Sequence, residues 1–207
     1  MKFTPLAIPD IILVEPNLHG DDRGYFVETF RQDLFNDAVG SIVNFVQDNE
    51  SKSSKGVLRG LHYQVSPYSQ SKLVKVIEGS VLDVALDIRR SSPTFGHHVA
   101  IELSSANKKQ LFIPRGFAHG FVVLSDFAVF SYKVDNIYAP ESDSGIRYDD
   151  KELNIDWGVE DSQVIVSEKD AEMFAPHVQH IMETTTVLPG VTLKAPPEIA
   201  NNWADGH

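Results

Sequence analysis

The chain contains no cysteine, so disulfide bonds and thiolate metal ligands are excluded. No apolar run approaches the roughly 20 residues that a membrane-spanning helix needs. Residues 1–5 lack the long apolar segment of a secretory signal. Positive charge is also scarce, because 18 lysines and arginines stand against 29 aspartates and glutamates, for a net charge of −11. An acidic surface repels nucleic acid and anionic membranes, so we expect neither as a partner. The absence of cysteine fits a cytoplasmic protein, which we expect.

The length and composition are those of an ordinary globular protein. With 207 residues, of which 42% are hydrophobic, the chain can bury a sizeable core in one domain. The end of the chain differs, because Pro189, Gly190, Pro196 and Pro197 fall within a short stretch. We therefore expect one domain over residues 1–183 and an extended or weakly ordered C-terminal extension over residues 184–207.

Short apolar runs separated by turn residues dominate the chain, and they predict β-strands. The runs lie at residues 27–30, 43–46, 58–63, 72–77, 81–88, 99–103, 110–113, 120–124 and 128–134. Their close, regular spacing favours an all-β antiparallel sandwich or barrel over alternating strands and helices. The turn at Gly79 predicts that two of these strands form a hairpin.

Helical signals are few. Residues 31–39 predict a short helix that ends at Gly40. Residues 170–174 predict another, with Asp170 as a plausible N-cap.

The run at residues 58–63 holds an unusual pair for a buried strand, Arg59 and His62. A histidine titrates near neutral pH and an arginine binds anions, so the pair suits a base next to an anionic ligand. The alternative is a core histidine bonded to a backbone carbonyl, with Arg59 reaching solvent. Side chains three positions apart on a regular strand point to opposite faces. The two can share a site only if Gly60 marks a β-bulge.

Two polar segments near the N-terminus suit a nucleotide ligand. Arg23, Phe26 and Glu28 offer a cation, an aromatic ring and a carboxylate for phosphate, base and hydroxyl groups. Gln47 and Asn49 offer amides for hydroxyls or carbonyls. The simpler interpretations are a solvated turn that enters an edge strand and a loop closed by side chain to backbone bonds.

Three more residues could complete a catalytic set. Lys72 has the strand parity of inward valines, and an inward lysine is tolerable if it meets a ligand oxyanion. Tyr132 is either a core tyrosine or a general acid. Asp170 is either a helix cap or a carboxylate that orients a catalytic histidine.

Residues 113–121 place His119 after a Pro-x-Gly turn and beside apolar partners, which is the pattern of the second half of a cupin β-helix. Metal cupins also carry a His-x-His pair in the first half, but here Tyr63 and Gln64 follow His62. Two histidines alone make a poor metal site, because catalytic zinc or iron usually takes three protein ligands.

Together these segments resemble the dTDP-4-dehydrorhamnose 3,5-epimerase family of nucleotide-sugar enzymes, from about Ile12 to Ala171. The residues that carry the resemblance are Asp22 to Glu28, Gln47 to Asn49 with Ser51, Gly56 to Gln64, Lys72 to Val74, Pro114 to Phe121, Tyr132-Lys133, Gly145 to Arg147 and Ser167 to Asp170. Two segments depart from the family: residues 66–71 before Lys72, and Tyr148, where a tryptophan is common. Both bear on substrate choice and on which carbons are inverted.

The resemblance implies a cupin-like jelly-roll barrel, no metal, no organic cofactor, and a homodimer whose N-terminal strands contribute to the partner. It implies that His62 is the general base, oriented by Asp170, that Tyr132 returns a proton from the opposite face, and that Lys72 stabilises the enolate oxygen at carbon 4. The implied substrate-binding residues are Arg23, Phe26, Glu28, Gln47, Asn49, Arg59, His119 and Tyr138. The substrate would be a dTDP-4-keto-6-deoxy sugar.

This chemistry also agrees with the residues themselves. Epimerisation beside a ketone needs a base, an oxyanion stabiliser and an acid on the other face, and the 4-keto group supplies the electron sink. Three alternatives remain at this point: a ketoisomerase on the same keto sugar, a metal-dependent cupin that uses His62 and His119, and a non-catalytic sugar-binding cupin.

Overall fold

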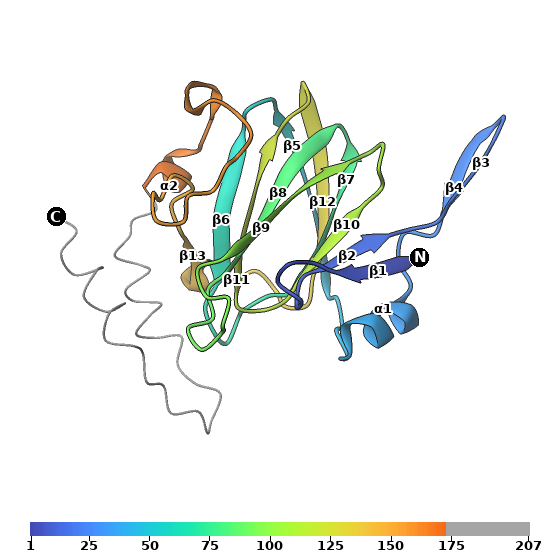
Figure 1. Ribbon diagram of the computed structural model, residues 1–207, viewed down its shortest axis with the longest axis horizontal. Helices are drawn as coiled ribbons and strands as arrows, with labels where there is room; N and C mark the ends of the chain where they lie inside the picture. The colour runs from blue at the N-terminus through green and yellow to red at the C-terminus, as the bar shows by residue number, and fades with distance from the viewer. Residues whose placement is uncertain (173–207) are drawn as a thin grey trace.

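Two antiparallel sheets face one another in the computed structural model, which describes residues 1–172 (Figure 1). The six-stranded sheet runs in the order β1 (Lys2–Pro5), β2 (Ile12–Glu15), β10 (Gln110–Ile113), β7 (Lys72–Glu78), β12 (Phe127–Val134) and β5 (Gln47–Ser54). The five-stranded sheet runs in the order β13 (Asp143–Gly145), β6 (Leu58–Gln64), β11 (Phe117–Val123), β8 (Ser80–Asp87) and β9 (His98–Ser104). This arrangement confirms the predicted all-β, jelly-roll class. The predicted extension 184–207 and the boundary at residue 183 lie outside the described residues.

The remaining elements lie around the sandwich. A separate hairpin, β3 (Leu18–Asp21) and β4 (Gly24–Val27), projects away from both sheets. The helix α1 (Gln32–Val39) and the short helix α2 (Glu168–Ala171) lie on opposite sides of the molecule (Figure 1). Two 3-10 turns complete the described chain, at Pro140–Ser142 and Asp161–Gln163. None of the helices in this part of the chain is long and apolar enough to span a membrane.

The interior between the sheets is apolar along most of its length. Strand alternation places every second side chain there, and Val74, Leu111, Phe121 and Phe130 are at most 5% exposed. Phe121 and Phe130, from opposite sheets, stack with their ring centroids 4.1 Å apart. This packing fixes the spacing between the sheets, and so it also fixes the polar side chains further along the same inner faces.

The outer faces of both sheets are covered. Phe35 of α1 packs edge-on against Phe112 of β10, with ring centroids 5.0 Å apart, and closes one end of the six-stranded sheet. Residues 146–166 cover the five-stranded sheet, where Trp157 is buried and its Nε1 donates to the carbonyl of Tyr148. These covers leave the inner faces as the place for a site enclosed by both sheets.

Several predictions about elements were wrong. Residues 72–88 do not form a hairpin, because β7 and β8 belong to different sheets and the chain crosses between them at Gly79. Residues 43–46 contain no strand. The side chains of Val43 and Phe45 pack with α1, and Val46 is exposed. The strand predicted at residues 27–30 ends at Val27. The polar strand β5 was not predicted.

The prediction for the first helix is confirmed, and the predicted N-cap of the second is wrong. The helix α1 and its left-handed cap at Gly40 match the prediction within one residue. In α2 the N-cap is Ser167, whose Oγ accepts a hydrogen bond from the backbone N of Asp170 at 3.1 Å. Asp170 is therefore not the N-cap, and its carboxylate is free to make another contact. Residues 173 and 174 of the predicted helix lie outside the described part.

Candidate active site

A cluster of polar side chains occupies the inner faces of the two sheets. The five-stranded sheet contributes Arg59 and His62 from β6, Asp83 from β8 and His119 from β11. The six-stranded sheet contributes Lys72 from β7 and Tyr132 from β12. The sandwich thus brings together residues that are far apart in sequence.

A bulge at Gly60 turns Arg59 and His62 toward the same face. On β11, His119 pairs with His62 but Phe121 pairs with Arg59, so the register shifts by one residue. Gly60 has φ +133°, and a Cβ there would lie 2.4 Å from the Cα of Gly120. Only glycine fits this close approach of two backbones. Of the two arrangements that the sequence left open, the structure has the one with a bulge at Gly60.

His62 and Asp170 form a hydrogen-bonded pair, with 2.6 Å between Nε2 and Oδ1. Since an ionised carboxylate can only accept, Nε2 carries the hydrogen and Nδ1 keeps its lone pair. Burial by itself raises the pKa of Asp170, but the bond and charge of His62, with help from Ser167 and Lys169, outweigh it and lower that pKa. Asp170 is 5% exposed, whereas the His62 side chain is 30% exposed. The carboxylate therefore lies behind an imidazole that is open to a ligand.

Lys72 extends its ammonium among these side chains. Its Nζ donates to the backbone carbonyl of His62 at 3.3 Å. Burial lowers the pKa of Lys72 to about 8, and the carboxylates of Asp83 and Asp143 oppose that fall. The predicted inward position of Lys72 is confirmed. At neutral pH the site holds a cation that is only partly solvated, which is the state that stabilises an oxyanion best.

His119 belongs to a second histidine–carboxylate pair. Its Nε2 lies 2.9 Å from Oδ2 of Asp83, which is fully buried. Burial lowers the pKa of His119, and the charges of Lys72 and His62 lower it further. The charge and hydrogen bond of Asp83 oppose this fall. Asp83 was not predicted as a site residue. A carboxylate that shares the inward face of a strand with Val81 and Ala85 could have indicated it.

Tyr132 lies on the wall formed by the six-stranded sheet. It pairs with Asn49 on β5 and with Val74 on β7. Burial raises the pKa of its phenol, while the nearby charge of Arg59 opposes that rise. A phenol held protonated at neutral pH can donate a proton.

The polar strand β5 adds the amides predicted from sequence. Residues 47, 49, 51 and 53 are the more buried ones in its alternating pattern, so they face inward. Gln47 Nε2 donates to Asn49 Oδ1 at 2.8 Å. Arg59 Nε donates to Ser53 Oγ at 3.1 Å, which holds the guanidinium beside this strand.

Tyr138 lies in a small network at the edge of the site. Its OH donates to Asp143 Oδ2 at 3.0 Å, and its backbone N donates to Gln47 Oε1 at 3.4 Å. Lys169 of α2 also pairs with Asp143. Asp143 and Lys169 were not predicted as site residues, and their positions depend on how β13 and α2 meet β6.

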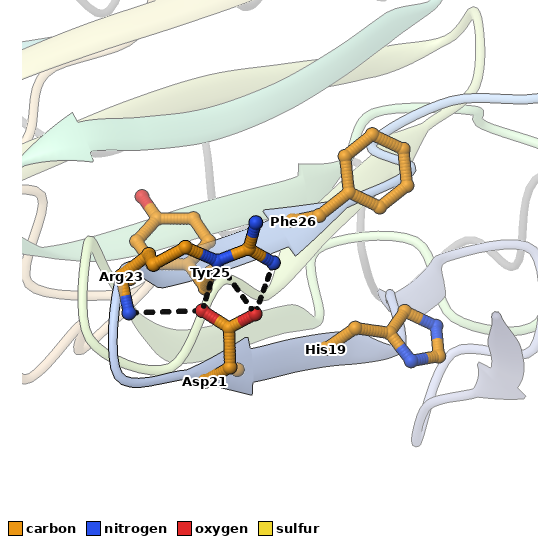
Figure 2. A pocket seen from close by; sticks show the side chains of 7 residues that line it. His19, Asp21, Arg23, Tyr25 and Phe26 are labelled. Atoms are coloured by element: carbon orange, nitrogen blue, oxygen red, sulfur yellow. Dashed lines mark hydrogen bonds and ion pairs between the residues drawn. The ribbon is translucent and has the colours of Figure 1, made fainter.

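The structure does not bring Arg23, Phe26 and Glu28 to His62. Arg23 and Phe26 lie on the projecting hairpin and Glu28 just after it, and all three are exposed. Figure 2 shows Arg23 folded over Asp21, with 2.5 Å between Nη2 and Oδ2, and Phe26 pointing away. Residues 19–21 and 23–26 line an open pocket of about 450 Å³ without any side chain from the sandwich. Within one chain, these residues form a separate surface.

The described residues include no cluster of three or more His, Asp or Glu side chains that could hold a metal ion. His62 and His119 each bond to a different carboxylate. Residues 1–172 therefore do not offer the ligand set that the metal-dependent alternative requires.

Comparison with known proteins points to one family. The family model for dTDP-4-dehydrorhamnose 3,5-epimerase matches residues 5–176. A relative of that name from Shigella flexneri is 56% identical over 170 residues, covering 82% of this chain and 93% of the relative. Another from Pseudomonas aeruginosa is 55% identical over 172 residues, covering 83% of this chain and 94% of the relative.

Solved structures agree. The dTDP-6-deoxy-D-glucose-3,5-epimerase of Legionella pneumophila, in complex with dTDP-4-keto-L-rhamnose, is 49% identical with a TM-score of 0.80. The match covers 83% of this chain and 90% of that one.

Proposed function

This chain belongs to the dTDP-4-dehydrorhamnose 3,5-epimerase family, and from that premise we propose how its residues carry out the reaction. The enzyme is an isomerase that inverts carbon 3, carbon 5 or both of a dTDP-4-dehydro-6-deoxyhexose, in deoxysugar biosynthesis of the dTDP-L-rhamnose type. The observation that carries the assignment of roles is the inner-face cluster: a His–Asp pair, a desolvated lysine and a half-buried tyrosine from two opposing sheets.

His62 is the general base in this proposal. Its free Nδ1 takes a proton from the carbon next to the 4-keto group, the C–H bond electrons form the enolate, and negative charge moves to the carbon-4 oxygen. Asp170 stabilises the imidazolium and holds the ring. Lys72 stabilises the enolate oxygen with its ammonium.

Tyr132 returns a proton to the other face of the same carbon. It comes from the six-stranded sheet whereas His62 comes from the five-stranded sheet, so a sugar between them meets a base on one side and an acid on the other. Inversion requires this opposition, because return of the proton by His62 would restore the original configuration.

The remaining polar side chains bind the substrate in this proposal: Arg59 binds the diphosphate, and Gln47, Asn49, His119 and Tyr138 bind the nucleotide sugar. The hydrogen bonds that hold Gln47, Asn49 and Arg59 at β5 support these roles. Arg23, Phe26 and Glu28 would act in the site of a second copy. Support for such a homodimer is the hairpin itself, which leaves the sandwich with Phe26 70% exposed and Tyr25 58% exposed. We include a cytoplasmic location in the proposal, since a chain without cysteine gains nothing from an oxidising compartment.

Incubation with dTDP-4-dehydro-6-deoxyglucose in deuterated water tests the function. We expect solvent deuterium at carbon 3, carbon 5 or both, and NMR of the product should show inverted centres. Deuterium at neither carbon would refute the proposal. A product whose carbonyl has moved to carbon 3 would instead identify a ketoisomerase.

A further inference from the structure

Asp83 is a buried carboxylate to which the reaction described above gives no role. It is 0% exposed and lies in the middle of β8, on the inner face of the five-stranded sheet, where it pairs with Phe121 of β11. Burying a carboxylate is costly unless charged or polar partners compensate. His119 compensates only one of its two oxygens, through the 2.9 Å contact with Oδ2.

The second oxygen of Asp83 has no hydrogen-bond partner among the described residues. Lys72 comes from the opposite sheet, and its only recorded hydrogen bond within residues 1–172 is to the carbonyl of His62. An ammonium has three hydrogens to donate, so two remain. A buried anion with a spare acceptor and a half-buried cation with spare donors face the same interior.

We propose that Asp83 is a positioning residue that keeps Lys72 protonated in the pH range where the enzyme works. The inference rests on the proposed role of Lys72 as enolate stabiliser. His119 holds the carboxylate through Oδ2, while Oδ1 is buried and has no hydrogen-bond partner among residues 1–172. Asp83 thus acts on the reaction through Lys72 and needs no contact with the sugar.

The surroundings of Lys72 support this assignment. The ionisable groups near it are Asp83 on β8, Asp143 on β13, His62 on β6 and His119 on β11, while its strand partners are Ile113 and Val134. Burial lowers the pKa of Lys72 to about 8, and among the groups that oppose this fall Asp83 has the largest effect. Asp143 is already paired with Lys169 and Tyr138. Asp83 is therefore the carboxylate that matters most to the charge of Lys72.

The direction of the effect follows from the charges. Lys72 must be protonated to stabilise an enolate, so kcat should fall as the pH rises through the pKa of Lys72. Removal of a nearby negative charge lowers the pKa of a cation, so Asp83→Asn should move that fall to lower pH. An opposite charge within about 4–6 Å typically shifts a pKa by about one to three units, and we take one unit for Asp83. For a one-unit shift, the ratio of variant to parent kcat should drop about sevenfold between pH 6 and pH 8.5.

The experiment measures kcat against pH for the full chain and for Asp83→Asn with the dTDP-4-keto sugar. Asparagine keeps the size of the side chain and can still bond to His119. Asp87→Asn is the matched control, because Asp87 is also 0% exposed on β8 but bonds to Arg89, Ser92 and Thr94 outside the cluster. We expect Asp87→Asn to lower stability and leave the pH profile in place. An unchanged alkaline limb in folded Asp83→Asn would overturn the inference.

Two further measurements separate this inference from the assignment of Lys72. Lys72→Arg carries a permanent cation, so its residual activity should lack the alkaline limb, and Asp83→Asn added to it should shift nothing. If the parent and Lys72→Arg share one alkaline limb, the role of Lys72 fails, independently of Asp83. If Asp83→Asn does not fold, Asp83→Ser takes its place in the same pH series: a fall of kcat at lower pH than in the parent supports the inference, and an unchanged alkaline limb overturns it.

Discussion

The Nε2 of His62 lies 2.6 Å from the Oδ1 of Asp170, although the two residues are 108 positions apart in the chain. His62 comes from β6, and Asp170 from a helix of four residues that begins after Ser167. The cap at Ser167 bonds to the backbone of Asp170, so the same helix turn that ends the described chain also aims this carboxylate.

Asp170→Asn should therefore lower kcat by about 10²–10⁴-fold, because the imidazolium of His62 loses its counter-charge and its tautomer is no longer fixed. KM should change little, since Asp170 lies behind the imidazole. Steady-state kinetics at neutral pH measure both. Asp149→Asn removes an exposed carboxylate that pairs with Arg147, and it should leave kcat unchanged. Equal losses in the two variants would contradict the role of Asp170.

His62→Ala and Tyr132→Phe should fail in different ways. Without the base, exchange of solvent deuterium at both carbons should fall by about 10²–10⁴-fold. Without the phenol, exchange should continue on the face of His62 while inversion falls further than exchange. Deuterium incorporation and product configuration, followed by NMR in the same sample, measure the two steps. The same ratio of inversion to exchange in both variants would argue against separate roles.

Gly60→Ala should destabilise the protein more than Gly24→Ala. Both glycines have φ close to +130°, but a Cβ at Gly24 meets nothing within 4 Å, whereas one at Gly60 lies 2.4 Å from the backbone of Gly120. Gly24→Ala should lower the free energy of unfolding by about 1–3 kcal/mol through backbone strain. Gly60→Ala should add the cost of separating β6 from β11, and it should also reduce activity. Urea denaturation compares the two, and equal losses of stability would count against the close approach.

Mixed dimers should reveal whether the hairpin acts in the partner's site. Arg23→Ala and His62→Ala should each be nearly inactive alone. When the two are unfolded and refolded together, half of the dimers are mixed, and each mixed dimer has one complete site if hairpins are exchanged. We therefore expect about a quarter of the parent activity. Activity no higher than that of the separate variants would mean that each chain uses its own hairpin.

The sequence predicts the strands whose side chains pack in the core, and it fails for the strand whose side chains line the site. Apolar strands such as β10 and β12 were predicted because their side chains pack between the sheets. The strand β5 contains only polar residues, since its inner face lines the site instead of the core, and so it lacked the apolar signal. Parity indicates that Arg59 and His62 share a face only if Gly60 marks a bulge, and the register shift between β6 and β11 shows that it does.

Other site features depend on three-dimensional pairing that no local pattern reveals. The chain around Gly79 looks like a hairpin, yet its two strands join different sheets, which only long-range partners decide. Asp83 lies in this segment, and its inward position depends on the sheet that β8 joins. The sequence leaves two roles open for Asp170, because an aspartate can either cap a helix or orient a histidine. The structure shows that the cap is Ser167.

The crossing at Gly79 has a consequence for how the enzyme acquires its activity. Lys72 and Asp83 flank that turn in sequence but reach the interior from opposite walls, and His62 and Tyr132 are divided in the same way. A half-folded chain with either sheet alone therefore contains only part of the site, and never the base together with Lys72 and Tyr132. Non-local pairing of this kind folds slowly. Turnover should appear in refolding only in the last kinetic phase, together with the fixed environment of the aromatic rings.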